Sequence, residues 1–212
     1  MNTLTSRSGR ALAAWTLLGL AAYALLPWYF LQQQSLWAAL PGVWGGDATA
    51  SGVVQAALHG RPWLWTGVAG LLIAGAGLLL PVGRAQGGVL VAGALLGLAG
   101  LLASGFAIGA PGWSFQTLEA WFGPLEHGQF GMGWGGFIAI ACLVMLLGAG
   151  VARLGFFRGD VFVAGAVVGC VSLLALFVVY PVLRSMASGL YDDMGLWAPG
   201  ALVDRLATER IW

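Results

Sequence analysis

Residues 161–183 read VFVAGAVVGCVSLLALFVVYPVL and contain no charged side chain. An α-helix rises about 1.5 Å per residue, so about 20 apolar residues cross the hydrocarbon core of a bilayer, which is about 30 Å thick. A run of this length and composition therefore predicts a membrane-spanning helix. A lone spanning strand is excluded, because lipid would leave its backbone N–H and C=O groups without partners. The sequence predicts an all-α protein of the membrane.

Four further segments share this length and composition. Only 8% of the 212 residues are charged and 59% are hydrophobic, whereas soluble domains carry roughly 25% charged residues. We expect a polytopic protein with five spans, divided into an N-terminal membrane region (1–160) and a fifth span with a tail outside the membrane (161–212). The four additional spans are rich in Leu, Ala, Gly and Val, and are predicted at 11–31, 63–80, 87–108 and 132–153.

Arginine placement predicts that the N-terminus is cytoplasmic. Cytoplasmic connections of membrane proteins carry an excess of basic residues. With the N-terminus inside, the outer connections 32–62 and 109–131 hold Arg61 as their single arginine, and the tail 184–212 lies outside. The cytoplasmic arginines are then Arg7, Arg10, Arg84, Arg153 and Arg158.

The first span also has features of a cleaved signal peptide. A positive segment precedes it, and Ala22-Tyr23-Ala24 has the small-x-small form of a cleavage site. The apolar run nevertheless continues to Phe30, which favours a retained helix.

The outer connections are expected to contain helices that lie on the membrane. Residues 113–123 predict a short amphipathic helix capped by Ser114, and residues 51–59 predict a weaker one. Indole rings prefer the membrane interface, where the ring is half-buried and its N–H is wet. The tryptophans at or near the predicted outer face are Trp28, Trp37, Trp44, Trp63, Trp65, Trp113, Trp121 and Trp134.

Small residues within the spans predict close packing between helices. The pairs Gly93-x3-Gly97 and Gly165-x3-Gly169 would let two helix backbones approach each other. The two cysteines, Cys142 and Cys170, lie inside apolar runs. We expect them to act as small apolar side chains and not to form a disulfide.

The sequence offers few candidates for chemistry. His59 and His127 lie in outer connections, and with Glu126 and Glu119 they have the donor atoms for an external cation site. We favour the alternative that all four are solvated loop residues. No span has an ionisable residue in its middle, and phosphate-loop, GxSxG and HExxH motifs are absent. We therefore expect no enzyme, cofactor or metal site and, with a net charge of +1, no nucleic-acid partner.

One element resembles a known family. Phe177-Val-Val-Tyr-Pro-Val-Leu-Arg184, followed by Ser-Met-Ala-Ser-Gly-Leu-Tyr-Asp-Asp193, resembles the opening helix of a binding-protein-dependent ABC transporter permease. The nearest resemblance is to ferric-iron permeases that carry an extra membrane region before the first permease repeat. Leu26-Pro27-Trp28-Tyr29 and Glu209-Arg210-Ile211-Trp212 also resemble such members.

The resemblance implies a membrane component of a bacterial inner-membrane importer for ferric iron or a similar small solute. Its implied partners, besides the lipid bilayer, are an ABC ATPase subunit and a periplasmic binding protein. The cytoplasmic E-A-A-x3-G loop that docks the ATPase in this family is absent. No coupling residue therefore carries over, and we expect the chain to be the N-terminal region of such a permease. Two other functions stay open: a free-standing membrane scaffold or assembly protein, and a haem- or quinone-associated subunit that uses His59 or His127.

Overall fold

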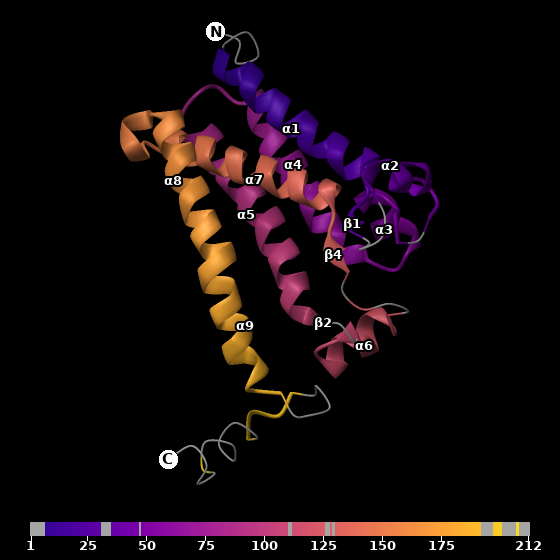
Figure 1. Ribbon diagram of the computed structural model, residues 1–212. Helices are drawn as coiled ribbons and strands as arrows, with labels where there is room; N and C mark the ends of the chain where they lie inside the picture. Colours follow the sequence, from indigo (N-terminus) through magenta and orange to yellow (C-terminus); the bar gives the residue numbers. More distant parts are fainter. Residues whose placement is uncertain are drawn as a thin grey trace. The chain divides into compact units, whose positions relative to one another are not determined.

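The computed structural model describes residues 7–30, 35–46, 48–109, 112–125, 128, 130–191, 197–200 and 207. It is 75% helical, which confirms the all-α class. Four of the described helices are long and apolar enough to cross a membrane, as expected of a multi-pass membrane protein (Figure 1). They are Pro62–Leu79, Arg84–Ala107, Trp134–Arg153 and Val161–Ser188. The chain forms two compact units: unit 1 contains Met1–Ser104 and Phe130–Cys170, and unit 2 contains Gly105–Gln129 and Val171–Trp212.

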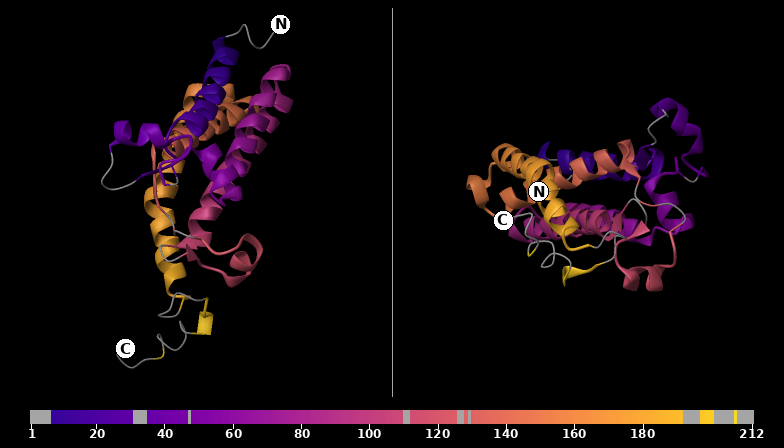
Figure 2. Two further views of the ribbon diagram at one scale, coloured as in Figure 1. Left: turned by 90° about the vertical axis from the view of Figure 1, so that its right-hand side faces the viewer. Right: turned by 60° about the horizontal axis from the view of Figure 1, so that its bottom comes forward.

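Unit 1 is a helical bundle in which α1 (Arg7–Leu25) packs along α7 (Trp134–Arg153). The two helices lie side by side in Figures 1 and 2, α1 in indigo and α7 in orange. They run in opposite directions, because Gly135 at the start of α7 approaches the Ala22 carbonyl near the end of α1. The other helices of the unit are α2 (Leu36–Ala39), α3 (Gly52–Leu58), α4 (Trp65–Ala76), α5 (Arg84–Ala107) and the first part of α8 (Val161–Leu174). Short 3-10 turns occupy Leu40–Gly42, Pro62–Leu64, Gly77–Leu79 and Phe156–Gly159.

The first predicted span ends earlier than expected. Residues 11–31 were predicted to be helical, but α1 ends at Leu25. Pro27 has no backbone N–H for a helix, and the Trp28 N–H donates instead to the Ala50 carbonyl at 3.1 Å. The chain then forms β1 (Tyr29–Phe30), which pairs antiparallel with β4 (Gly131–Met132). The shortened α1 is not among the four helices that meet the length and hydropathy of a span.

Glycines bring the helices of unit 1 into backbone contact. A Cβ atom on Gly93 of α5 would clash with the Ala74 nitrogen of α4 and would lie 2.7 Å from the Gly70 carbonyl oxygen. A Cβ on Gly97 would lie 2.9 Å from Leu143 Cδ1 of α7. These contacts confirm the close approach predicted for Gly93-x3-Gly97, since only glycine leaves room for it.

The second predicted glycine pair does not create a close helix contact. A Cβ on Gly165 or on Gly169 of α8 would meet no atom within 4 Å. The glycine that α8 approaches closely is Gly148 of α7, where a Cβ would lie 2.8 Å from the Gly165 Cα. Cys142 is buried and Cys170 is exposed, and both are free thiols, as expected.

Unit 2 contains a small hairpin and a helix that continues through a proline. Strand β2 (Ile108–Gly109) pairs with β3 (Gly112–Trp113), and α6 (Gln116–Phe122) follows. The π-helical turn Ala175–Val179 joins the end of α8 to α9 (Tyr180–Ser188). In this turn the Tyr180 N–H donates to the Ala175 carbonyl, five residues earlier. This hydrogen-bonded loop is wider than that of an α-helix and accommodates Pro181 within the helix. The fifth span, predicted to end at residue 183, therefore reaches Ser188.

The two short helices of the outer connections differ from their predictions. Helix α6 exists, but its N-cap is Phe115 without a side-chain bond, so the predicted cap by Ser114 is wrong. Helix α3 is capped by Ser51, whose hydroxyl accepts from the Val54 N–H, and it buries Val54, Gln55 and Ala56 in unit 1. It packs in the core of unit 1 through these residues, whereas Ala57 and Leu58 at its end are exposed.

The tryptophans divide into buried and exposed groups. Trp28 is only 5% exposed and packs on the Tyr23 ring at 4.2 Å between centroids, so its indole is buried in unit 1 and does not reach lipid headgroups. Trp37 and Trp121 are 78% and 80% exposed, which leaves their indoles free for lipid headgroups.

Membrane orientation is testable by cysteine labelling. In a protein with Cys142 and Cys170 replaced by Ala, we expect a cysteine introduced within 113–127 to react with an impermeant thiol reagent added outside intact cells. A cysteine in place of Arg84 or Gly155 should react only after the membrane is opened. The reverse pattern would show that the N-terminus is outside.

The close contact at Gly93 predicts that a larger side chain there destabilises the protein. Gly93→Leu should lower the free energy of unfolding by about 3 kcal/mol or more, because the added atoms meet backbone and the helices must separate. Gly88→Leu, on the same helix, is the control, since its side chain meets open space. Unfolding in detergent measures both, and equal losses would contradict the packing described above.

Candidate functional site

Three buried side chains, Tyr23, Tyr29 and Arg61, make hydrogen bonds where α1 ends. The Tyr23 hydroxyl donates to the Leu64 carbonyl, and Arg61 Nη1 donates to the Tyr29 hydroxyl oxygen at 2.9 Å. Both bonds tie the end of α1 and strand β1 to the segment that leads into α4. Their donors and acceptors lie more than thirty residues apart, so together they fix the tertiary position of this segment.

Arg61 is a buried cation in an aromatic setting. It is 4% exposed, and its guanidinium carbon lies 4.7 Å from the centroid of the Tyr29 ring and 5.5 Å from that of Phe130. The two rings are themselves 5.5 Å apart. Arginine stacks on aromatic faces through the ring quadrupole, which offsets part of the cost of removing the charge from water.

The local sequence makes room for this cluster. A Cβ on Gly52 would lie 2.6 Å from Trp28 Cε3, and one on Gly67 would lie 2.7 Å from the Tyr23 hydroxyl oxygen. Glycine at these positions lets α3 and α4 approach the aromatic rings. Gly60, with φ of +64°, and Pro62, at the start of a 3-10 turn, turn the chain on either side of Arg61.

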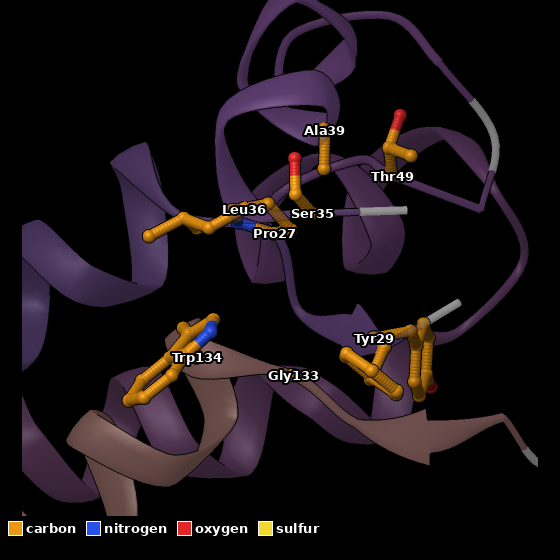
Figure 3. Close-up of a pocket in the computed structure, with 9 residues that line it drawn as sticks. Pro27, Tyr29, Ser35, Leu36, Ala39, Thr49, Gly133 and Trp134 are labelled. Atoms are coloured by element: carbon orange, nitrogen blue, oxygen red, sulfur yellow. The ribbon is translucent and has the colours of Figure 1, made fainter. Parts of the chain in front are cut away.

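A small cavity adjoins the cluster (Figure 3). Its volume of 20 Å³ holds about one water molecule. Trp134 and Tyr29 lie on one side of the opening, and Ser35 and Thr49 lie on the other. The lining residues are Pro27, Tyr29, Phe30, Ser35, Leu36, Ala39, Thr49, Gly133 and Trp134. A cavity of this size is too small for a solute to be transported or transformed.

Unit 2 has a polar contact of its own. Arg184 Nη1 of α9 donates to the Phe106 carbonyl oxygen near the end of α5 at 3.3 Å. One turn earlier, the Tyr180 ring meets the Phe106 ring edge-on, with 5.1 Å between centroids. The last carbonyls of a helix lack intrahelical donors and carry partial negative charge, which favours a cation there. Both Tyr180 and Arg184 belong to the element that resembles ABC permeases.

Of the residues considered for a cation site, the structure describes two, which belong to different units. His59 directly follows α3 in unit 1, and Glu119 is exposed on α6 of unit 2. Glu126 and His127 lie outside the described residues. Among the residues that the structure describes, no group of three His, Cys, Asp or Glu side chains is placed to hold a metal.

Sequence reasoning did not single out the buried polar groups of unit 1. Tyr23 and Tyr29 lie in the segment predicted as the first span, and Gln86 lies just before the third. Gln86 is fully buried, and its Nε2 donates to the Gly77 carbonyl at 3.0 Å. A polar residue in or beside an apolar run is the one signal that pointed to them, because such a group must find a partner.

The Arg61–Tyr29 bond can be tested by removing one hydroxyl. Tyr29→Phe should lower the free energy of unfolding by about 2 kcal/mol, because the buried Arg61 guanidinium loses the hydroxyl oxygen that accepts its hydrogen bond. Tyr180→Phe is the matched control: among the described residues its hydroxyl makes no hydrogen bond, so the change should stay within about 0.5 kcal/mol. Equal effects in detergent unfolding would show that the bond contributes nothing.

Comparison with known proteins finds no relative of this chain. The chain matches no protein-family model, no curated protein and no solved structure. The function proposed below therefore rests on the helices described here and on the resemblance carried by residues 177–193.

Proposed function

We propose that the chain is a membrane component of a bacterial inner-membrane ABC importer for ferric iron or a similar small solute. The observation that carries this proposal is the helix Val161–Ser188. It has 28 residues, and its most apolar 18-residue stretch has a mean hydropathy of 2.7. Only 6% of that stretch is buried, against 56% for the corresponding stretch of Trp134–Arg153. In the proposed importer this helix packs against the helices of the transport core.

The apolar side chains of this helix are exposed and available to a neighbouring helix. They lie on all of its sides, since every residue from Leu173 to Val179 is exposed. The polar contact of Arg184 with the Phe106 carbonyl lies on the same helix. The element that resembles ABC permeases is therefore anchored within unit 2 while its apolar surface stays exposed among the described residues.

The described spans provide no polar route for a solute by themselves. Their charged residues lie only near helix ends: Arg84, Arg153 and Arg184. A transport pathway needs polar groups at membrane depth. In the proposed importer that pathway, and the loop that couples to the ATPase, belong to the permease core. The ATPase and the periplasmic binding protein act through that core.

A free-standing scaffold or assembly protein is the second candidate. The short connections at 80–83 and 154–160 favour it, because neither is large enough to contain a helix that docks an ATPase. The two candidates differ in whether residues of α8 contact a transport core.

Uptake measurements test the proposal. With only the ATPase and binding protein of a ferric-iron importer, we expect the chain to support no ATP-dependent uptake of radioactive iron. Fusion of the importer's permease core after Trp212 should restore uptake. In this fusion Gly169→Leu should lower uptake at least about tenfold at equal protein amount, because a misplaced helix contact costs several kcal/mol.

Gly88→Leu is the matched control, since a side chain at either glycine meets open space within the chain. It should leave uptake unchanged. A fusion without uptake, or one that Gly169→Leu does not affect, would favour the scaffold.

A further inference from the structure

Several arginines lie at one end of unit 1. Helix α5 begins against the last turn of α7, because a Cβ on Gly87 would lie 2.9 Å from the Arg153 Cβ. The turn after α7 folds back on the same helix end, where a Cβ on Gly159 would lie 3.8 Å from the Ala152 carbonyl oxygen. Arg84, at the start of α5, and Arg158, in that turn, are therefore close to Arg153.

Helix α1 adds a fourth arginine to this end. A Cβ on Gly19 would lie 3.1 Å from the Cys142 Cβ, and one on Gly135 would lie 3.1 Å from the Ala22 carbonyl oxygen. Because these contacts make α1 antiparallel to α7, the start of α1 lies beside the end of α7. Arg10 in its first turn is exposed. We call Arg10, Arg84, Arg153 and Arg158 the basic end.

Little negative charge balances the basic end. The carboxylate residues of unit 1 are Asp47 and Asp160, and Asp47 lies outside the described residues. Asp160 Oδ1 already accepts the backbone N–H of Phe162 at 2.8 Å and that of Val163 at 3.1 Å. It acts as the N-cap of α8. Arg10, Arg84 and Arg158 are exposed, and Arg153 is partly buried.

Apolar side chains are exposed beside these arginines. Leu79 is 82% exposed, Phe156 is 60% exposed and Phe162 is 84% exposed. The turn that contains Phe156 has an unusual backbone: Phe157 and Arg158 have φ values of 52° and 57°, between two glycines that also have positive φ. Non-glycine residues adopt this conformation at a cost, and such outliers concentrate at binding sites.

We propose that the basic end binds the headgroups of anionic phospholipids in the adjoining leaflet. Guanidinium groups form paired hydrogen bonds with phosphate oxygens, and basic clusters at the membrane surface attract anionic lipids. The exposed phenylalanine and leucine side chains beside the charges favour a lipid over a free anion, because the acyl chains of a lipid would cover them. Arginine and aromatic residues thus contact one ligand with a charged head and an apolar tail.

Lipid selectivity of the full chain in vesicles tests this site. Spin-labelled phosphatidylglycerol and phosphatidylcholine report by electron paramagnetic resonance how strongly each lipid is held at the protein surface. We expect the native chain to prefer phosphatidylglycerol at least about threefold, since each arginine near an anionic surface contributes roughly a fivefold gain at low salt. The preference should fall as sodium chloride is raised.

Variants that remove the charge and variants that keep it distinguish loss of lipid binding from a general loss of stability. The triple variant Arg84→Gln, Arg153→Gln, Arg158→Gln should lose the preference, while the corresponding triple Lys variant should keep most of it. Arg158→Gln alone, at an exposed position, should lower it measurably if the triple Gln variant does not fold. Arg184→Gln is the matched single-charge control, because Arg184 donates to the Phe106 carbonyl in unit 2, and it should leave the preference unchanged.

Three results would overturn the proposal. The first is equal retention of the two lipids by the native chain. The second is a preference that survives in both folded Gln variants. The third is displacement of bound phosphatidylglycerol by millimolar inorganic phosphate, which would identify the ligand as a soluble anion. Loss of preference in the Gln variants, with inorganic phosphate ineffective, supports the lipid site. This test does not involve iron uptake, so its outcome is independent of the importer proposal.

Discussion

Backbone contact between helices at glycine is the constraint on which unit 1 depends. Lipid is as apolar as the helices it surrounds, so burial of apolar surface supplies little drive for association inside a bilayer, and close van der Waals contact must supply it. The Gly70 and Gly93 backbones bring α4 against α5, and Gly87 brings α5 against α7. A side chain at any of these positions would meet the backbone of the neighbouring helix and force the two axes apart.

The position of α7 in turn determines how α1 ends. Gly135 lies against the carbonyls of Ala22 and Pro27, and the Gly133 N–H donates to the Trp28 carbonyl at 2.9 Å. The chain therefore leaves the helix at Leu25 and pairs with β4 as a strand. This turn places Tyr29 beside Arg61. The Tyr29 hydroxyl and the rings of Tyr29 and Phe130 then stabilise the buried guanidinium.

Hydropathy and length were sufficient to predict the spans at 63–80, 87–108, 132–153 and 161–183, because a long apolar run has few other solutions in a membrane. They failed where a distant partner decides the structure. The end of α1 depends on β4, about a hundred residues away, and the burial of α3 depends on packing against α1 and α4. For the same reason the Arg61–Tyr29 contact was not predicted: local sequence gives no sign that the two residues meet. Residues 192–193 and 209–212 of the resemblance lie outside the described residues.

The buried polar groups of unit 1 bear on where any activity resides. Tyr23 and Gln86 donate to backbone carbonyls, and Arg61 donates to Tyr29, which lines a cavity that admits about one water. Groups arranged in this way hold helices in place. What the described part of the chain offers to other molecules lies on its surface. The exposed surface of α8 and α9 is apolar, whereas the basic end combines charge with exposed apolar side chains. Since these two surfaces differ in chemistry, a helix of a transport core and a headgroup would not compete for one position.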